Sequence, residues 1–311
     1  MKKKKKAEKI VKEKKIAKIA YKTKLGTYYQ GKVEDVLDSK RFANKYKGKI
    51  NLIFTSPPFP LNKKKKYGNR QGEEYLEWLS DLSLLFKDYL TPKGSIVIEL
   101  GNAWTSGSPV MSVLPIQALL KFLEKGNLKL CQQFVWYNTA KLPTPAEWVN
   151  IKRIRVKDAF TNIWWMSKTA FPKANNRRVL KKYSSSMQSL LKRQKYNSGM
   201  RPSQHSINET SFLTRNKGAI PPNVISSPNT SIDKNYQEYC NQNNLPLHPA
   251  RMPLSLAEFF INFLTTKKNI IMDPFGGSNT TGKAAEILGR KWVSIEASEE
   301  YIKGSRGRFI K

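Results

Sequence analysis

Five consecutive residues in the first third of the chain could hold a flat ring that carries an amino group. They are Thr55-Ser56-Pro57-Pro58-Phe59, and they follow an apolar run. Proline fixes φ and lacks a backbone donor, so Pro57 and Pro58 make a stiff loop with outward carbonyls. The Ser56 hydroxyl and the Pro57 carbonyl can accept hydrogen bonds from an amino group, and Phe59 offers a stacking face. A plain turn with a packed phenylalanine is the alternative.

A second motif could hold an adenosine-containing molecule. The sequence DPFGGSNTT (273–281) lies between an apolar strand and a predicted helix. Gly276 and Gly277 let the backbone approach a ligand, and the helix start adds free N–H groups and a positive dipole end. Glu296 closes the next predicted strand, twenty positions after Gly276, where such βαβ units place a carboxylate on ribose hydroxyls. A structural turn is the alternative, and the absence of GxGxxG disfavours a nicotinamide cofactor.

Strands and helices alternate around both motifs. Apolar runs predict strands at 49–55, 95–100, 129–138, 162–168, 269–272 and 291–298. Helical spacing predicts helices at 73–90, 113–126, 255–264 and 278–289. Two finer predictions are that Gly126 ends its helix and that Ser255 caps the next one, with Glu258 as its capping-box partner. The alternation predicts an α/β fold with a mostly parallel sheet flanked by helices.

Positive charge is concentrated in two segments of a chain whose formal net charge is +33. Such a charge favours a polyanionic partner, because Lys and Arg release counterions from phosphates. The N-terminal segment, 1–25, is Lys-rich, and Ile10, Ile16 and Ile19 have roughly helical spacing. It could attract DNA or be a frayed tail.

The segment 171–245 is the second basic region, with twelve Lys or Arg between 171 and 235 against Glu209 and Asp233. Basic residues among Tyr, Asn, Gln and Ser suit phosphate and base-edge contacts, and a flexible insertion is the alternative. The candidate DNA-binding residues are Arg177, Arg178, Lys181, Lys182, Lys192, Arg193 and Lys195.

Several classes of protein are disfavoured by composition. The two cysteines, Cys131 and Cys240, have no metal-ligand spacing, and His205 and His248 are the only histidines. We therefore expect no metal site and no disulfide framework. No apolar stretch is long enough to span a bilayer, and no signal-peptide core follows the first lysines, so we expect a cytoplasmic protein without membrane partners.

The two motifs together resemble the β-class DNA amino-methyltransferases of restriction–modification systems. In that family the catalytic loop comes first, a target-recognition region follows, and the cofactor loop lies near the C-terminus, a circularly permuted order. The stretches 136–169 and 248–264 resemble the PvuII-type, N4-cytosine members in particular. The resemblance implies a Rossmann-like fold that uses S-adenosylmethionine. It divides the chain into a basic arm (1–25), a first catalytic part (26–170), a target-recognition region (171–245) and a cofactor-binding part (246–311).

The resemblance also implies residue roles. Ser56, Pro57, Pro58 and Phe59 would hold the target base, flipped out of the duplex. The cofactor would be bound by Asp273, Phe275, Gly276, Gly277, Ser278, Thr280, Thr281 and Glu296, and by His248, Ala250 and Arg251. The chain departs from the family where Lys32 follows Gly31 and where Asn51 replaces an acidic residue.

The implied reaction is direct transfer of a sulfonium methyl group to an exocyclic base nitrogen. C5 methylation of cytosine needs a Cys nucleophile, which that family carries after proline. Leu130 precedes Cys131 and Tyr239 precedes Cys240, which disfavours C5 chemistry. Serine at the first motif position accompanies cytosine N4 in the family, whereas Asp or Asn accompanies adenine N6. Ser56 therefore favours N4-methylcytosine in double-stranded DNA.

Two other functions stay open at this point. One is adenine-N6 methylation by the same kind of enzyme, and the other is a non-catalytic DNA-binding protein that kept the fold. The family context adds a cognate restriction endonuclease as a companion that is not needed for activity, a CAGCTG-like target, and nucleoid association if the source is bacterial. The sequence does not predict the oligomeric state.

Overall fold

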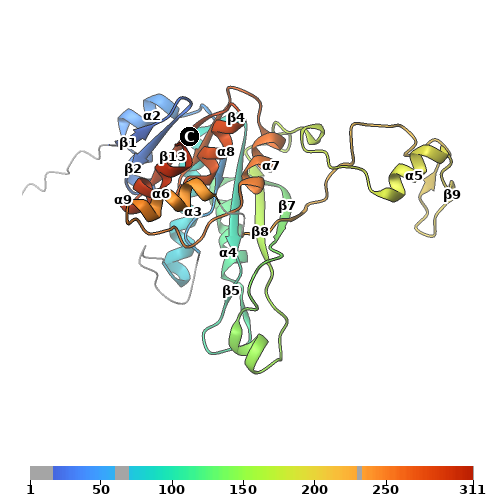
Figure 1. Cartoon of the computed structure of the whole chain (residues 1–311), viewed down its shortest axis with the longest axis horizontal. Coiled ribbons are helices and arrows are strands. Elements are labelled where there is room, and N and C mark those ends of the chain that lie inside the picture. Colours follow the sequence, from blue (N-terminus) through green and yellow to red (C-terminus); the bar gives the residue numbers. More distant parts are fainter. Residues whose placement is uncertain (1–16, 60–69, 230–232, 311) are drawn as a thin grey trace, which may run out of the picture.

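The computed structural model describes residues 17–59, 70–229 and 233–310. A sheet with helices on both sides forms the main body (Figure 1). Two projections leave this body, a pair of loops below β5 and an arm that carries α5 and β9. None of the helices in the described ranges is long and apolar enough to cross a membrane.

The central sheet is mostly parallel, as predicted. Its nine strands lie in the order β1-β2-β13-β12-β3-β4-β8-β7-β11. The run from β2 to β4 is parallel throughout, β11 is parallel to β7, and the other three pairings are antiparallel. The strands are β1 Lys18–Lys22, β2 Gly26–Gln30, β3 Ile50–Thr55, β4 Leu90–Gly101, β7 Lys129–Tyr137, β8 Phe160–Ser167, β11 Val224–Ser226, β12 Ile270–Asp273 and β13 Lys291–Glu296.

Helices and short strands complete the described part. The helices are α1 Val33–Leu37, α2 Lys40–Tyr46, α3 Gly72–Tyr89, α4 Leu114–Gly126, α5 Ser185–Arg193, α6 Lys234–Gln242, α7 Leu254–Leu264, α8 Thr280–Ile287 and α9 Glu299–Ser305. Single turns are η1 Glu147–Ile151, η2 Asn176–Arg178 and η3 Arg306–Arg308. Two hairpins pair β5 Ala103–Trp104 with β6 Met111–Ser112, and β9 Gly199–Met200 with β10 Ser206–Ile207.

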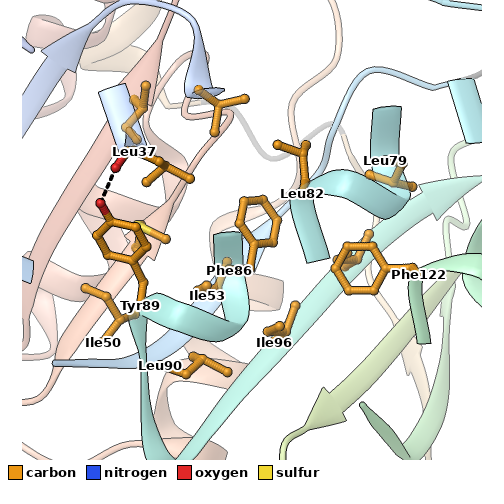
Figure 2. Close-up of a cluster of buried hydrophobic side chains, with 14 of the residues drawn as sticks. Leu37, Ile50, Ile53, Leu79, Leu82, Phe86, Tyr89, Leu90, Ile96 and Phe122 are labelled. Atoms are coloured by element: carbon orange, nitrogen blue, oxygen red, sulfur yellow. Dashed lines mark hydrogen bonds between the residues drawn. The ribbon is translucent and has the colours of Figure 1, made fainter. Parts of the chain in front are cut away.

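An apolar layer covers each face of the sheet. Side chains alternate along a strand, so Ile53 faces one layer while Leu52 and Phe54 face the other. In the first layer, Phe86 of α3 lies among aliphatic side chains of the sheet and helices (Figure 2). In the second, Phe54 packs on Phe260 of α7, with 5.3 Å between ring centroids. Both layers fix β3, and with it the loop that follows.

The roughly helical spacing near the N-terminus does not correspond to a helix in the described residues. Lys18–Lys22 forms β1, an edge strand antiparallel to β2. The Tyr21 ring packs edge-on against Tyr28, and its hydroxyl shares a 2.8 Å hydrogen bond with Ser305. These tertiary contacts outweigh the helical spacing, and the rest of the predicted arm, 1–16, lies outside the described residues.

The structure places α6 on the main body rather than in the projecting arm that carries α5 and β9. Tyr236 and Cys240 are buried, and Asp233 forms a 2.8 Å ion pair with Arg308. The segment 171–179 also contacts the body, because the Asn175 N–H donates to the Phe263 carbonyl. Within 171–245, the part that stands away is therefore centred on α5 and the β9–β10 hairpin (Figure 1).

Of the two predicted helix ends, one is confirmed, because α4 ends at Gly126, and the other differs. Ser255 does not cap α7; Pro253 holds the cap position without a side-chain bond, and the Ser255 hydroxyl pairs with Ser227 instead. Asn127, just after Gly126, takes the left-handed conformation that ends α4. Both helices exist where they were predicted, because packing decides their presence more than their caps do.

Candidate active site

One cavity of about 1010 Å³ lies where β3, β4, β12 and β13 end. Ligands of open α/β sheets bind outside the carboxyl ends of the strands. All four residues predicted to hold the base line this cavity, and so do all eleven predicted for the cofactor. The two loops meet because β12 is the direct neighbour of β3 in the sheet, although 214 residues lie between Thr55, the end of β3, and Ile270, the start of β12.

The SPPF loop leaves β3 at this edge of the sheet. Pro57 is buried, while Ser56, Pro58 and Phe59 are half-buried and border the cavity. The Phe59 ring lies against Gly101, where an added Cβ would come within 2.7 Å of Phe59 Cδ2. Glycine at the end of β4 therefore makes room for the ring that is predicted to stack on the base.

Glu99 is a cavity residue that the sequence analysis missed. It is 4% exposed and lies two positions before the end of β4. Burial raises the pKa of its carboxyl to about 7, although a hydrogen bond with the Ser56 side chain and the charge of Lys141 both act to lower it. Such a group exchanges a proton near neutral pH, directly beside the serine of the loop.

A hydrogen bond joins the two motifs. The Thr55 hydroxyl donates to Asp273 Oδ1 at 2.7 Å, and the Phe275 N–H donates to the same oxygen at 3.1 Å. Burial raises the pKa of the Asp273 carboxyl to about 6, against these hydrogen bonds. Asp273 is thus bound into the loop structure itself, and it sets the position of the glycines that follow.

Close neighbours explain why positions 276 and 277 of the cofactor loop are both glycine. A Cβ on Gly276 would lie 2.6 Å from the Tyr28 hydroxyl, and one on Gly277 would lie 2.8 Å from His248 Nε2. Gly277 also has φ +49°, which disfavours any side chain. The loop is therefore closely packed between β2 and the segment 248–253, and the loop residues Ser278, Thr280 and Thr281 are buried.

Glu296 ends β13 beside this loop, as predicted for a ribose-binding carboxylate. Its Oε2 accepts from the Gly277 N–H at 2.9 Å, and its Oε1 accepts from the Ser298 N–H at 2.9 Å. Burial raises its pKa, and backbone N–H groups oppose that shift. The carboxylate is thus held in one orientation at the cavity wall.

His248, Ala250 and Arg251 also line the cavity, next to the cofactor loop. His248 Nδ1 lies 2.6 Å from the Ala250 carbonyl, and its ring meets the Tyr301 ring edge-on at 4.5 Å. Burial lowers the pKa of His248 to about 4, so the ring is neutral at physiological pH. Arg251 lies over the Tyr236 ring at 5.6 Å and supplies positive charge to this part of the cavity.

Arg308 supports the cofactor loop from below, and sequence reasoning missed it. It is 4% exposed and donates to both the carbonyl and the hydroxyl of Ser278. Its other nitrogen pairs with Asp233 at 2.8 Å, which explains why α6 belongs to the body. No sequence pattern distinguishes Arg308 from the many other basic residues of the chain.

An aromatic pair and a polar cluster also line the cavity. The Trp78 ring packs on the Phe275 ring, with 5.6 Å between their centroids, and Trp78 Nε1 donates to the Glu34 carboxylate. Glu34 and Lys32, one of the departures from the family, both line the cavity. In the polar cluster, Asp158 Oδ1 accepts a hydrogen bond from the Asn102 side-chain amide at 2.8 Å, and the Asp158 carboxylate lies 3.5 Å from Lys141 Nζ. Asn51, the other departure from the family, accepts from the Ile270 N–H and so joins β3 to β12.

The predicted DNA-binding residues lie away from the cavity. Arg177, Lys181, Lys182, Lys192, Arg193 and Lys195 are exposed. Arg178 differs, because it is half-buried, donates to the Phe263 carbonyl at 2.7 Å, and has a pKa lowered by burial. It anchors the arm to α7. Among the described residues, no cluster of His, Cys, Asp and Glu is placed to hold a metal ion.

The fold and the paired loops define the class of Rossmann-like amino-methyltransferases. The chain belongs to the DNA methylase family of N6- and N4-methyltransferases, whose model matches residues 50–306. It is 40% identical over 293 residues to the type II methyltransferase M.PvuII of Proteus hauseri, covering 94% of this chain and 85% of that protein. M.HpaI of Haemophilus parainfluenzae is 26% identical over 278 residues, covering 86% and 71%.

Solved structures agree with this assignment. The cytosine-N4-specific PvuII DNA methyltransferase superposes with a TM-score of 0.76 and 35% identity, covering 95% of this chain and 90% of that one. The M1.HpyAVI–SAM complex has a TM-score of 0.56 at 20% identity and covers 92% of this chain and all of that one, so it shares the fold.

Proposed function

We propose that this chain is a DNA methyltransferase that transfers the methyl group of S-adenosylmethionine to N4 of a flipped cytosine. The observation that carries the proposal is the meeting of the SPPF loop and the DPFGG loop in one cavity, with a buried carboxyl beside Ser56. The likeness to M.PvuII over most of both chains supports the same chemistry, and restriction–modification as the setting.

The cavity residues fit the cofactor. Glu296 presents a carboxylate held by two N–H groups, suited to ribose hydroxyls. The Trp78–Phe275 pair offers aromatic surface for adenine, and Arg251 offers a cation for the methionine carboxylate. When bound, S-adenosylmethionine supplies an electrophilic methyl group on sulfur.

The base site can orient an amino group and accept its proton. The Ser56 hydroxyl and the Pro57 carbonyl would accept hydrogen bonds from the cytosine amino group, so that its lone pair faces the methyl group. One N–C bond forms as the sulfur–methyl bond breaks, and the nitrogen then loses a proton. Glu99, hydrogen-bonded to Ser56 and with a pKa of about 7, is suited to receive this proton.

We assign the partners and regions on the same basis. Double-stranded DNA is the proposed substrate, in the cytoplasm, and the arm around α5 is the proposed target-recognition region. The six exposed basic residues of 177–195 would bind phosphates. A cognate endonuclease would cleave the same site when it is unmethylated, and it would not be needed for methylation.

The test is to identify the modified nucleoside. Purified protein is incubated with S-adenosylmethionine and unmethylated DNA, and the digested nucleosides are analysed by mass spectrometry. We expect N4-methylcytosine, strongly reduced in Ser56→Ala and Phe59→Ala but retained in Phe171→Ala, whose side chain is 82% exposed. N6-methyladenine would overturn the choice of base. Absence of both product and cofactor binding would favour the non-catalytic DNA-binding protein.

A further inference from the structure

Two loops project from the cavity rim and lie beside each other at their tips. The first is 105–110, between β5 and β6, and the second is 138–159, which contains η1. Arg155 Nε donates to the Pro109 carbonyl at 3.0 Å, which ties the two loops together. We call this pair of loops the finger, and it lies below β5 in Figure 1.

The segment 151–157 of the finger, IKRIRVK, contains three aliphatic and four basic residues, all of them exposed. Val156 is 87% exposed, Ile151 is 74% and Ile154 is 52%. Single exposed aliphatic residues are ordinary, but three in seven residues beside Val110 (53%) and Met111 (46%) make an apolar tip. The interspersed Lys and Arg disfavour a protein partner and favour a polyanion with an apolar interior.

The finger holds this segment in place next to the base site. The Ile154 N–H donates to the Trp148 carbonyl at 3.0 Å, and the Asp158 N–H donates to the Thr144 carbonyl at 2.9 Å. Asp158 itself lines the cavity. Val156 therefore lies two residues along the chain from a side chain that lines the cavity predicted to receive the base.

Flipping a base leaves a gap in the stack that must be filled or kept open. Proteins that distort DNA insert aliphatic side chains between base steps and offset the unstacking of a few kcal/mol with new contacts. We propose that the segment 151–157 is a wedge that enters the duplex at the flipped base, with Val156 in the vacated space and Lys152 and Lys157 on the flanking phosphates. The inference rests on the proposed function and adds the element that opens the duplex.

The test compares two duplexes that differ only at the target cytosine, which is either paired with guanine or mispaired. Mispairing lowers the free energy needed to flip the base, so the wedge should no longer be needed on the mispaired duplex. We expect Val156→Ala to lower kcat/KM about tenfold or more on the paired duplex, and to leave it within about twofold of wild type on the mispaired one. Ile287→Ala, 53% exposed on α8, is the matched control.

Other outcomes overturn the wedge. An equal loss on both duplexes would mean that Val156 acts in binding or folding, and no loss on either would mean that it does nothing in this reaction. A changed oligomeric state without a change in kinetics would assign the tip to a protein contact. A wild-type protein that methylates neither duplex would instead remove the proposed function, and the wedge with it.

The basic side chains of the wedge give an independent readout. Lys152→Gln with Lys157→Gln should weaken binding to both duplexes alike, and lower the slope of log K against log salt by about 2. An unchanged slope would contradict their placement on phosphates.

Discussion

The Thr55 hydroxyl donates a 2.7 Å hydrogen bond to the Asp273 carboxylate, 218 residues further along the chain. The two residues end neighbouring strands and begin the two loops that line the cavity. Each loop therefore sets the position of the other, and changes at this bond should affect both halves of the site.

Thr55→Val should destabilise the fold. The substitution removes a donor from a buried carboxylate, and an unsatisfied buried acceptor costs about 1–3 kcal/mol. Urea unfolding should show a lower free energy of unfolding for Thr55→Val than for Thr214→Val, an exposed control in the arm. Equal stabilities of the two variants would mean that the bond contributes nothing.

Gly101→Ala should slow methyl transfer without weakening cofactor binding. The new Cβ would collide with Phe59, and displacing a positioning ring by an ångström can lower the rate about 100-fold. Kinetics and calorimetry would separate the two effects. In a Phe59→Ala background the same substitution should cause no further loss, because the ring that it displaces is already gone; additive losses would contradict this explanation.

Activity should rise with pH and level off above about 7. The pKa of Glu99 is raised to about 7, so the carboxylate that accepts the proton accumulates as pH rises through that value. Measured kcat/KM across this range should show the inflection in the wild type, and Glu99→Gln should be slow without it. An unchanged profile in Glu99→Gln would assign the inflection to another group.

The same carboxyl should make stability fall as pH rises. Its pKa is 4.5 in the unfolded reference and about 7 in the fold, so between these values the folded state binds more protons. Stability is therefore lost with rising pH, on the order of 3 kcal/mol in total. Denaturant unfolding at about pH 5 and about pH 8 should show Glu99→Gln gaining stability relative to wild type at the higher pH. A constant difference would contradict the buried carboxyl.

Basic residues of the arm should separate into two groups. Lys192→Gln, Arg193→Gln and Lys195→Gln together should lower the salt slope of DNA binding by about 3, since each exposed cation releases about one counterion. Arg178→Gln should lower stability instead, because its guanidinium bonds to the Phe263 carbonyl. Measured slopes and unfolding free energies for both variants test the division; a change of slope in Arg178→Gln alone would reverse it.

Sequence alone determined the α/β order, the two loops and the residues in them. These are local properties, because strand–loop–helix patterns, the stiffness of Pro57 and Pro58, and the freedom of Gly277 need no distant partner. All fifteen residues predicted for the base and cofactor line the cavity, although their individual roles stay predictions. The choice of N4 over N6 rested on Ser56 and on family resemblance, since the chemistry of the two reactions is nearly the same.

Tertiary structure decided what lies between distant segments. The pKa of Glu99 depends on burial by the sheet, and Arg308 supports the cofactor loop only because the chain end folds back beneath Ser278. Residues 18–22 form a strand because they pair with β2 at the edge of the sheet, although the spacing of their apolar residues is roughly helical. These outcomes come from contacts between residues far apart in the sequence, and no local pattern of side chains encodes them.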